Sequence, residues 1–363
     1  GDETTPQSAD GDGDGFTDLV EIAYGSDPND SNSVIPPDVF YVVLPWKAPE
    51  PEMRELEFGT SITYADILIQ VDLSGSMEGE HLNLAQGINN VIIDGVKAQI
   101  PNAAFGLVKF GTLEDQPYNL AQPITTDATA VQNAVNSIQL CTGGWEPHVE
   151  TLYQSASGEG TTGVMELCTG LWGGCEDYTV TFPPANCPPD TVGGACFRSF
   201  ALPIFLMISD EAFDTPNWES GTQHNLSEAI AAMNTIGAKF IGVDSSGFDD
   251  AKSDYHTISV GTGSIDAAGD PFNFVIASDG TGMSDAIVDS VISLTEGIQL
   301  QTVGTEKQGV ENEQSIDTGE FIKGITPISA TPADGAAGFD ESSFQNVNPG
   351  TNLLFNVEFY NDV

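Results

Sequence analysis

Two stretches of this sequence place oxygen-bearing residues at spacings that suit a hard divalent cation. The first is DGDGDGFTDLVE, residues 10–21, with oxygens on alternate residues, a glycine at the sixth position and a glutamate at the twelfth. Calcium needs about six to eight close oxygens, and aspartates crowded in this way repel one another without a cation. The pattern predicts a calcium loop, against the alternative of an acidic flexible linker, with these ligands: Asp10, Asp12, Asp14, Phe16, Asp18 and Glu21.

The second stretch is DILIQVDLSGSM, residues 66–77, in which an apolar run ends in Asp72, Ser74 and Ser76. A later apolar run, FLMISDEAF at 205–213, delivers Asp210 in the same way. Parallel strands bind ligands beyond their carboxyl ends, so we expect these side chains to converge at one edge of a sheet. Oxygen ligands of this kind suit Mg2+, Ca2+ or Mn2+. For DLSGSM alone, a turn with serine caps is the simpler alternative.

The middle of the chain supplies the elements that must position this second site. Five apolar runs are predicted as buried strands: 65–73, 103–111, 201–210, 238–245 and 271–278. Between them, apolar residues recur at three- and four-residue steps in five segments predicted as helices: 81–100, 128–140, 149–157, 226–238 and 282–298. The alternation predicts an α/β fold, a doubly wound and mostly parallel sheet with helices on both faces.

The D-x-S-x-S stretch after a buried strand, followed later by a strand-ending aspartate, resembles the metal-ion-dependent adhesion site of von Willebrand factor type A domains and integrins. The resemblance covers about residues 62–299. It implies one adhesion-type metal site with these ligands: Asp72, Ser74, Ser76, Glu146 and Asp210. Thr142 is the fallback for Glu146 on the middle loop. His148, close by, is predicted as a solvated loop histidine, and Glu78 and Glu80 only partly supply the extra calcium site of integrin β subunits.

The calcium loop continues into EIAYGSDPNDSNS, which lacks the long flanking helices of a sensor EF-hand. The segment resembles the thrombospondin type 3 and related calcium repeats of extracellular proteins. The resemblance implies a spacer that calcium stiffens, so the ion is expected to order a stalk.

Charge and composition exclude several classes of partner and reaction. The 363 residues include 54 acidic and 9 basic side chains, and a net charge of -45 repels nucleic acid and anionic membranes. No P-loop, G-x-S-x-G or complete G-x-G-x-x-G motif occurs. We therefore do not expect an enzyme. A hydrolase that uses a metal-activated water is the least favoured reading, because no base can be identified for it.

Five cysteines fall in one segment rich in Gly, Pro and Thr, which predicts loops stapled by disulfides in an oxidising compartment. Their spacings do not suit zinc. We expect Cys187 to pair with Cys196, and an odd cysteine remains. This insertion, 158–200, lies just before the strand that carries Asp210, so it should project near the metal edge. Its aromatic residues could frame a binding surface or merely pack the insertion itself: Trp145, Trp172, Tyr178 and Phe182.

Four regions follow from these patterns. They are a calcium repeat or stalk at 1–35, a flank at 36–61, the type A-like domain at 62–299 and a sandwich region at 300–363. Residues 37–60 contain a strand and a proline-broken connection, and residues 319–360 alternate in the manner of sandwich strands, so the two flanks are expected to pair into one β-sandwich. A separate C-terminal sandwich is the alternative.

The combined prediction is an extracellular bacterial surface protein that binds an acidic group of its partner through Mg2+, Mn2+ or Ca2+. The partner is expected to be a protein or polysaccharide ligand on a surface. The alternative is a structural subunit of a surface assembly, with neighbouring subunits as partners. No apolar run is long enough to span a membrane, and we expect a processed or trimmed chain whose anchor lies outside it.

Overall fold

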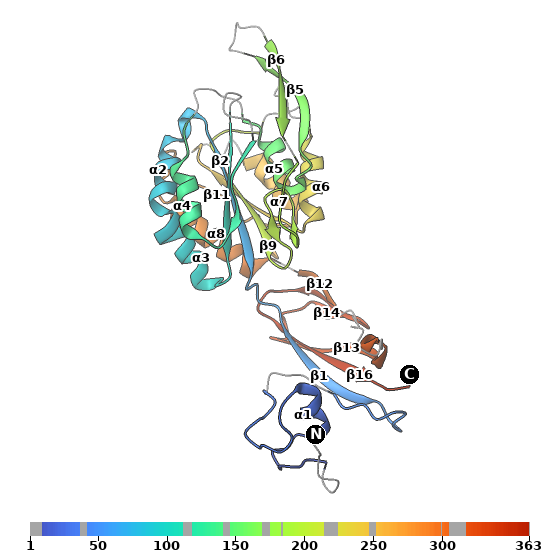
Figure 1. Ribbon diagram of the computed structural model, residues 1–363. Coiled ribbons are helices and arrows are strands. Elements are labelled where there is room, and N and C mark those ends of the chain that lie inside the picture. Colours follow the sequence, from blue (N-terminus) through green and yellow to red (C-terminus); the bar gives the residue numbers. More distant parts are fainter. Residues whose placement is uncertain are drawn as a thin grey trace.

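The computed structural model describes residues 9–362 except 37–41, 112–117, 141–145, 169–174, 183, 214–223, 247–251, 299 and 305–316. The protein is a mixed α/β structure. Its α/β unit lies at one end of the molecule, and two small sheets and the N-terminal segment lie at the other (Figure 1). Among the described residues, no helix combines the length and the apolar character needed to cross a bilayer.

A six-stranded sheet forms the centre of the α/β unit, in the order β11-β10-β9-β2-β3-β4. Neighbouring strands run parallel except at the β3–β4 edge, which is antiparallel. Every residue of β2 is buried, because helices cover both of its faces, and this explains its continuous apolar run. The strands are β2 (Ala65–Asp72), β3 (Ala104–Phe110), β4 (Tyr118–Thr125), β9 (Leu202–Ser209), β10 (Lys239–Asp244) and β11 (Phe274–Val275).

Alternate residues of β2 point into two separate cores. Ile67 and Ile69 pack under one group of helices, whereas Leu68 packs under the other (Figure 1). The first group is α2 (Glu78–Gly87), the π-helical turn η2 (Ile88–Ile93), α3 (Asp94–Gln99), α4 (Ala128–Asn136) and α8 (Met283–Gly297). The second group is α5 (His148–Ser157), α6 (Leu226–Thr235) and α7 (Lys252–Gly261).

The predicted elements are found with three differences. β4 and α7 were not predicted, because neither carries the continuous apolar run or the strong three- and four-residue repeat of its neighbours. The run 271–278 forms only the two residues of β11. The Asn273 side chain accepts the Gly242 backbone N–H at 2.6 Å, a donor that a longer parallel ladder would use.

The cysteine-rich insertion contains a hairpin of β5 (Thr161–Cys168) and β6 (Cys175–Phe182), which projects beyond the α/β unit at the end far from the two small sheets (Figure 1). A second small pair, β7 (Thr191–Val192) and β8 (Phe197–Arg198), follows. The predicted disulfide Cys187–Cys196 is confirmed. The four aromatic residues considered as a binding surface or as packing of the insertion lie outside the residues whose side chains the structure describes.

Two three-stranded sheets pack together beyond the opposite end of the α/β unit. One has the order β1-β16-β13 and the other β12-β15-β14. β1 (Glu52–Gly59) pairs along its full length with β16 (Asn352–Phe359), so strands from the two flanks share a sheet. The others are β12 (Leu300–Gly304), β13 (Ile322–Thr331), β14 (Gly338–Phe339) and β15 (Ser343–Val347), with the 3-10 turn η4 (Thr318–Phe321) before β13. Phe344, Val347, Leu353 and Phe355 form their core.

Candidate metal sites

The N-terminal loop gathers three of its predicted ligands. One carboxylate oxygen each of Asp10, Asp12 and Asp14 lies within 4.8 Å of the others. Backbone N–H groups hold these side chains in place: Gly13 donates to Asp10 at 2.7 Å, and Phe16 donates to Asp14 at 2.8 Å. The Oδ2 atoms of Asp12 and Asp14 are buried without a hydrogen-bond partner. Buried acceptors in this state fit a bound cation.

Two further predicted ligands come from α1 (Asp18–Tyr24), the short helix that follows the loop. Glu21 is fully buried, its Oε2 has no hydrogen-bond partner, and burial together with the charges of Asp12 and Asp14 raises its pKa. Asp18 is also buried, but its Oδ1 accepts the Gly11 backbone N–H at 2.6 Å and it lies outside the close group of three. The loop and the start of α1 therefore bring five carboxylates into electrostatic contact within one segment of chain: Asp10, Asp12, Asp14, Asp18 and Glu21.

The second site begins where β2 ends. Asp72 is completely buried, and its two carboxylate oxygens accept hydrogen bonds from the Ser74 N–H at 2.7 Å and the Ser209 hydroxyl at 2.8 Å. The His81 Nε2–H donates to the Asp72 carbonyl at 2.6 Å and fixes the backbone there. The turn η1 (Gly75–Met77) carries Ser76, whose hydroxyl lies 3.1 Å from that of Ser74. These contacts place the predicted D-x-S-x-S oxygens on one loop.

Glu146 reaches this loop from the segment that precedes α5. It is buried, and one of its carboxylate oxygens lies within 4.8 Å of an Asp72 oxygen. Burial, followed by the charges of Asp72 and Asp210, raises the pKa of Glu146 to about 10. Burial also raises the pKa of Asp72 to about 6, and Asp210 adds to this. Both shifts mean that the ionised forms of Asp72 and Glu146 are disfavoured in this buried site, a cost that a bound cation would relieve.

Asp210 directly follows β9 and is less close to the others. Asp210 is not among the residues whose ligand atoms lie within 4.8 Å of one another, which are Asp72, Glu146 and His148. Its charge nevertheless raises the pKa of both Asp72 and Glu146. Its Oδ1 is buried without a hydrogen-bond partner. Thr142, the fallback ligand, lies outside the described residues. Of the two glutamates considered for an extra calcium site, Glu80 is buried with an unpartnered Oε2, whereas Glu78 is exposed.

The prediction of His148 as a solvated loop histidine is wrong. Its side chain is only 1% exposed, because it starts α5 underneath the loop and packs between aromatic rings. The imidazole stacks on Phe213 at 4.3 Å and meets Phe110 edge-on at 5.1 Å. Burial lowers the pKa of His148 to about 3, against a smaller opposing effect of the Glu146 carbonyl. One of its ring nitrogens belongs to the same 4.8 Å group as Asp72 and Glu146.

No positively charged side chain neutralises this group within the described part of the chain. The ion pairs between described residues involve neither Asp72, Glu146 nor Asp210. Hydroxyls, carboxylates and a neutral imidazole together form a donor set that fits a divalent cation. The residue that the sequence interpretation overlooked is Ser209, which directly precedes Asp210 and binds both Asp72 and His148.

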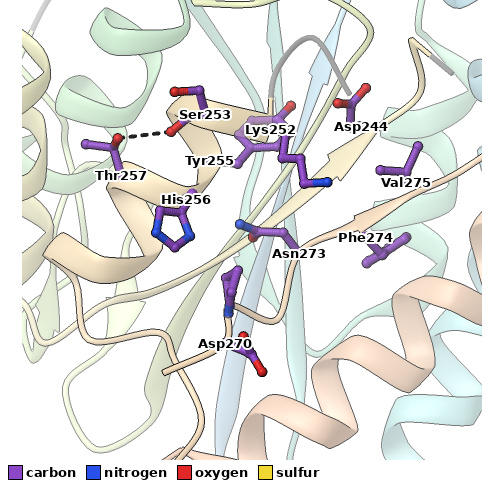
Figure 2. A pocket seen from close by; sticks show the side chains of 11 residues that line it. Asp244, Lys252, Ser253, Tyr255, His256, Thr257, Asp270, Asn273, Phe274 and Val275 are labelled. Carbon is purple, nitrogen blue, oxygen red and sulfur yellow. Dashed lines mark hydrogen bonds between the residues drawn. The ribbon is translucent and has the colours of Figure 1, made fainter. Parts of the chain in front are cut away.

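A pocket of about 570 Å³ opens beside the C-terminal end of β10, between that strand and α7 (Figure 2). Asp244, the last residue of β10, and the Tyr255 ring of α7 both line it. Asp244 Oδ2 and the Tyr255 hydroxyl are buried without hydrogen-bond partners. Asp244 ends a predicted strand as Asp72 and Asp210 do, so the same sequence signal could have identified it.

Comparisons with known proteins agree with the N-terminal site. A family model described as the bacterial TSP3 repeat matches residues 10–31. The segment is therefore a calcium-binding repeat of a type found in bacteria. No protein of curated function matches the chain significantly.

Solved structures resemble the chain only distantly. One is proximal thread matrix protein 1 from the mussel byssus, with 14% identity, a TM-score of 0.41 and coverage of 69% of this chain and 51% of that one. Another is the pilus adhesin SpaC from Lactobacillus rhamnosus GG, with 10% identity, a TM-score of 0.39 and coverage of 86% and 42%. The chain thus spans about half the length of these structures, or less.

Proposed function

We propose that the chain is a bacterial surface protein that binds an acidic group of its partner through a divalent cation at the carboxyl edge of β2 and β9. The α/β unit is then a von Willebrand A-like domain. The sheet order, the helices on both faces and the D-x-S-x-S loop at the end of a central strand all support this assignment. The role is binding, and no catalytic step is assigned to the site.

One observation carries the proposal. Two buried carboxylates, Asp72 and Glu146, approach each other at the end of a central strand, and no lysine or arginine pairs with either among the described residues. Ionising both groups without a cation is costly in a low-dielectric setting. A divalent cation is the simplest group that makes the arrangement favourable.

Each residue of the site has a definite task. Asp72 and Glu146 supply charge, the Ser74 and Ser76 hydroxyls supply neutral oxygens, and Asp210 adds a more distant carboxylate. Ser209 and the Ser74 N–H orient Asp72 by hydrogen bonds at 2.8 and 2.7 Å. When bound, the metal would supply an open coordination position for a carboxylate of the partner.

The calcium repeat fits the same proposal from the other end of the molecule. Calcium held by Asp10, Asp12, Asp14 and Glu21 stiffens the N-terminal segment, while the metal edge faces away from it (Figure 1). We propose an extracellular location and a protein or polysaccharide partner with acidic groups.

Calorimetric titration of the metal-stripped protein with Ca2+, Mg2+ and Mn2+ tests the proposal. Asp72→Ala is expected to remove one binding event and Asp14→Ala another, each leaving the other unchanged. The two variants thus serve as controls for each other, because the two sites lie in separate regions. If Asp72→Ala leaves every binding event intact, the site on the α/β unit does not bind metal and the proposed function fails.

A further inference from the structure

The hydrogen bonds around Ser209 determine which nitrogen of His148 carries the proton. The Ser209 hydroxyl has one proton and donates it to Asp72 Oδ2 at 2.8 Å. His148 Nε2 lies 2.9 Å from the same hydroxyl oxygen, so Nε2–H must be the donor in that contact. The neutral ring therefore carries its lone pair on Nδ1.

No donor gives a hydrogen bond to that lone pair among the described residues. Nδ1 of His148 is buried and has no hydrogen-bond partner, although the side chain is only 1% exposed. Stacking on Phe213 at 4.3 Å and the edge contact with Phe110 restrict rotation of the ring. A fixed, buried acceptor without a donor is costly unless another group, such as a metal, completes it.

The same arrangement is typical of histidines that ligate metals. Such a histidine donates its second ring N–H to an oxygen, which fixes the tautomer and aims the free nitrogen at the metal. Here Ser209 provides that oxygen, and one ring nitrogen of His148 lies within 4.8 Å of a carboxylate oxygen of Asp72 and of Glu146.

We infer that His148 supplies a nitrogen ligand through Nδ1, so that the site on the α/β unit prefers Mn2+ or Zn2+ to Mg2+ and Ca2+. This inference rests on the proposed function, because it names the metal class of the same site. Imidazole suits transition metals, whereas magnesium and calcium favour shells made only of oxygen.

The chain contains its own reference site for this comparison. The N-terminal loop offers carboxylates as the side-chain ligands of its close group, Asp10, Asp12 and Asp14. It should therefore keep the preference for calcium that an oxygen-only shell gives. The two sites of one protein are expected to differ in metal class.

Two measurements on the full chain test the inference. In the Asp14→Ala background, calorimetry is expected to give at least about tenfold tighter binding of Mn2+ and Zn2+ than of Mg2+ at the site that Asp72→Ala removes. His148→Phe keeps an aromatic ring and loses the nitrogen. It is expected to weaken Mn2+ and Zn2+ binding about 10- to 100-fold and to change Mg2+ binding less than about threefold. Ser209→Ala removes the hydrogen bonds that orient both Asp72 and His148, so it should weaken every metal, with the larger loss for Mn2+ and Zn2+.

The second measurement needs no variant. Pulsed electron paramagnetic resonance of the wild-type protein loaded with one equivalent of Mn2+ at this site is expected to show hyperfine coupling to a directly bound nitrogen. Absence of that coupling, or an equal loss for every metal in His148→Phe, overturns the inference and leaves His148 as a positioning residue. With either result the wild-type protein still binds metal through Asp72, so the proposed function is not contradicted. If the wild-type protein binds no metal at the site that includes Asp72, the proposed function itself is contradicted.

Discussion

Replacing Asp72 by asparagine should stabilise the metal-free protein at neutral pH. Burial raises the pKa of Asp72 from 3.8 to about 6, so above pH 6 the folded state holds a buried charge that the unfolded state exposes to water. The unfolded state loses its proton first, and stability therefore falls as pH rises from about 4 to 6. A shift of about two units corresponds to about 3 kcal/mol, which the neutral asparagine recovers at pH 7.5.

The gain is reduced by one lost contact. The Ser209 hydroxyl donates to Asp72 Oδ2, and an amide nitrogen at that position cannot accept this bond, which costs about 1 kcal/mol. We expect Asp72→Asn to be more stable than the wild type by about 2 kcal/mol at pH 7.5. At pH 4 the charge penalty of the wild type is nearly gone because its carboxyl is protonated in the folded state, so the lost Ser209 contact should leave Asp72→Asn equal to or up to about 1 kcal/mol less stable than the wild type.

Urea unfolding in EDTA, followed by far-ultraviolet circular dichroism at both pH values, measures the difference in the free energy of unfolding. Asp14→Asn, in the calcium repeat, is the matched Asp-to-Asn control outside the α/β unit. Saturating metal should reverse the order, since only the wild type binds it at this site. A variant that is less stable than the wild type at pH 7.5 in EDTA would refute the argument.

Three further substitutions test the packing of the α/β unit, each by urea unfolding. Arg198→Met removes the partner of buried Asp66, 2.6 Å away, and should cost about 3–5 kcal/mol; a loss below 1 kcal/mol would mean that the pair is not desolvated. Gly242→Ala adds a methyl group 2.3 Å from the Tyr255 ring and should cost about 1–3 kcal/mol, unless the ring can move away at no cost. Asn225→Ala removes the capping box of α6 and should cost about 1 kcal/mol, whereas no change would show that the cap is dispensable.

The strands and helices of the α/β unit could be recognised from sequence because their apolar residues recur with distinct periods. β2, β3, β9 and β10 appear within one or two residues of the predicted runs, since strands covered on both faces are continuously apolar. β4 was not predicted, because it is an edge strand that is only partly buried and contains Pro123. The pairing of β1 with β16 joins distant parts of the chain, and the sequence left it as one of two alternatives.

By itself, the sequence determined the features that depend on local spacing. The calcium loop and the D-x-S-x-S turn each hold their ligands within a few residues, and the loop that the Cys187–Cys196 disulfide closes is equally short. Backbone geometry alone then fixes which oxygens or sulfurs can meet.

Only the tertiary structure decided which residues lie beneath the D-x-S-x-S turn. Glu146, His148 and Ser209 come from separate segments, and they reach Asp72 because β9 pairs with β2 and α5 packs on the same face of the sheet. Burial then changes their chemistry, since the low-dielectric surroundings keep His148 neutral and hold protons on carboxyl groups. Neither the burial nor the tautomer of His148 can be read from its neighbours in sequence, because both depend on atoms that the fold brings from elsewhere.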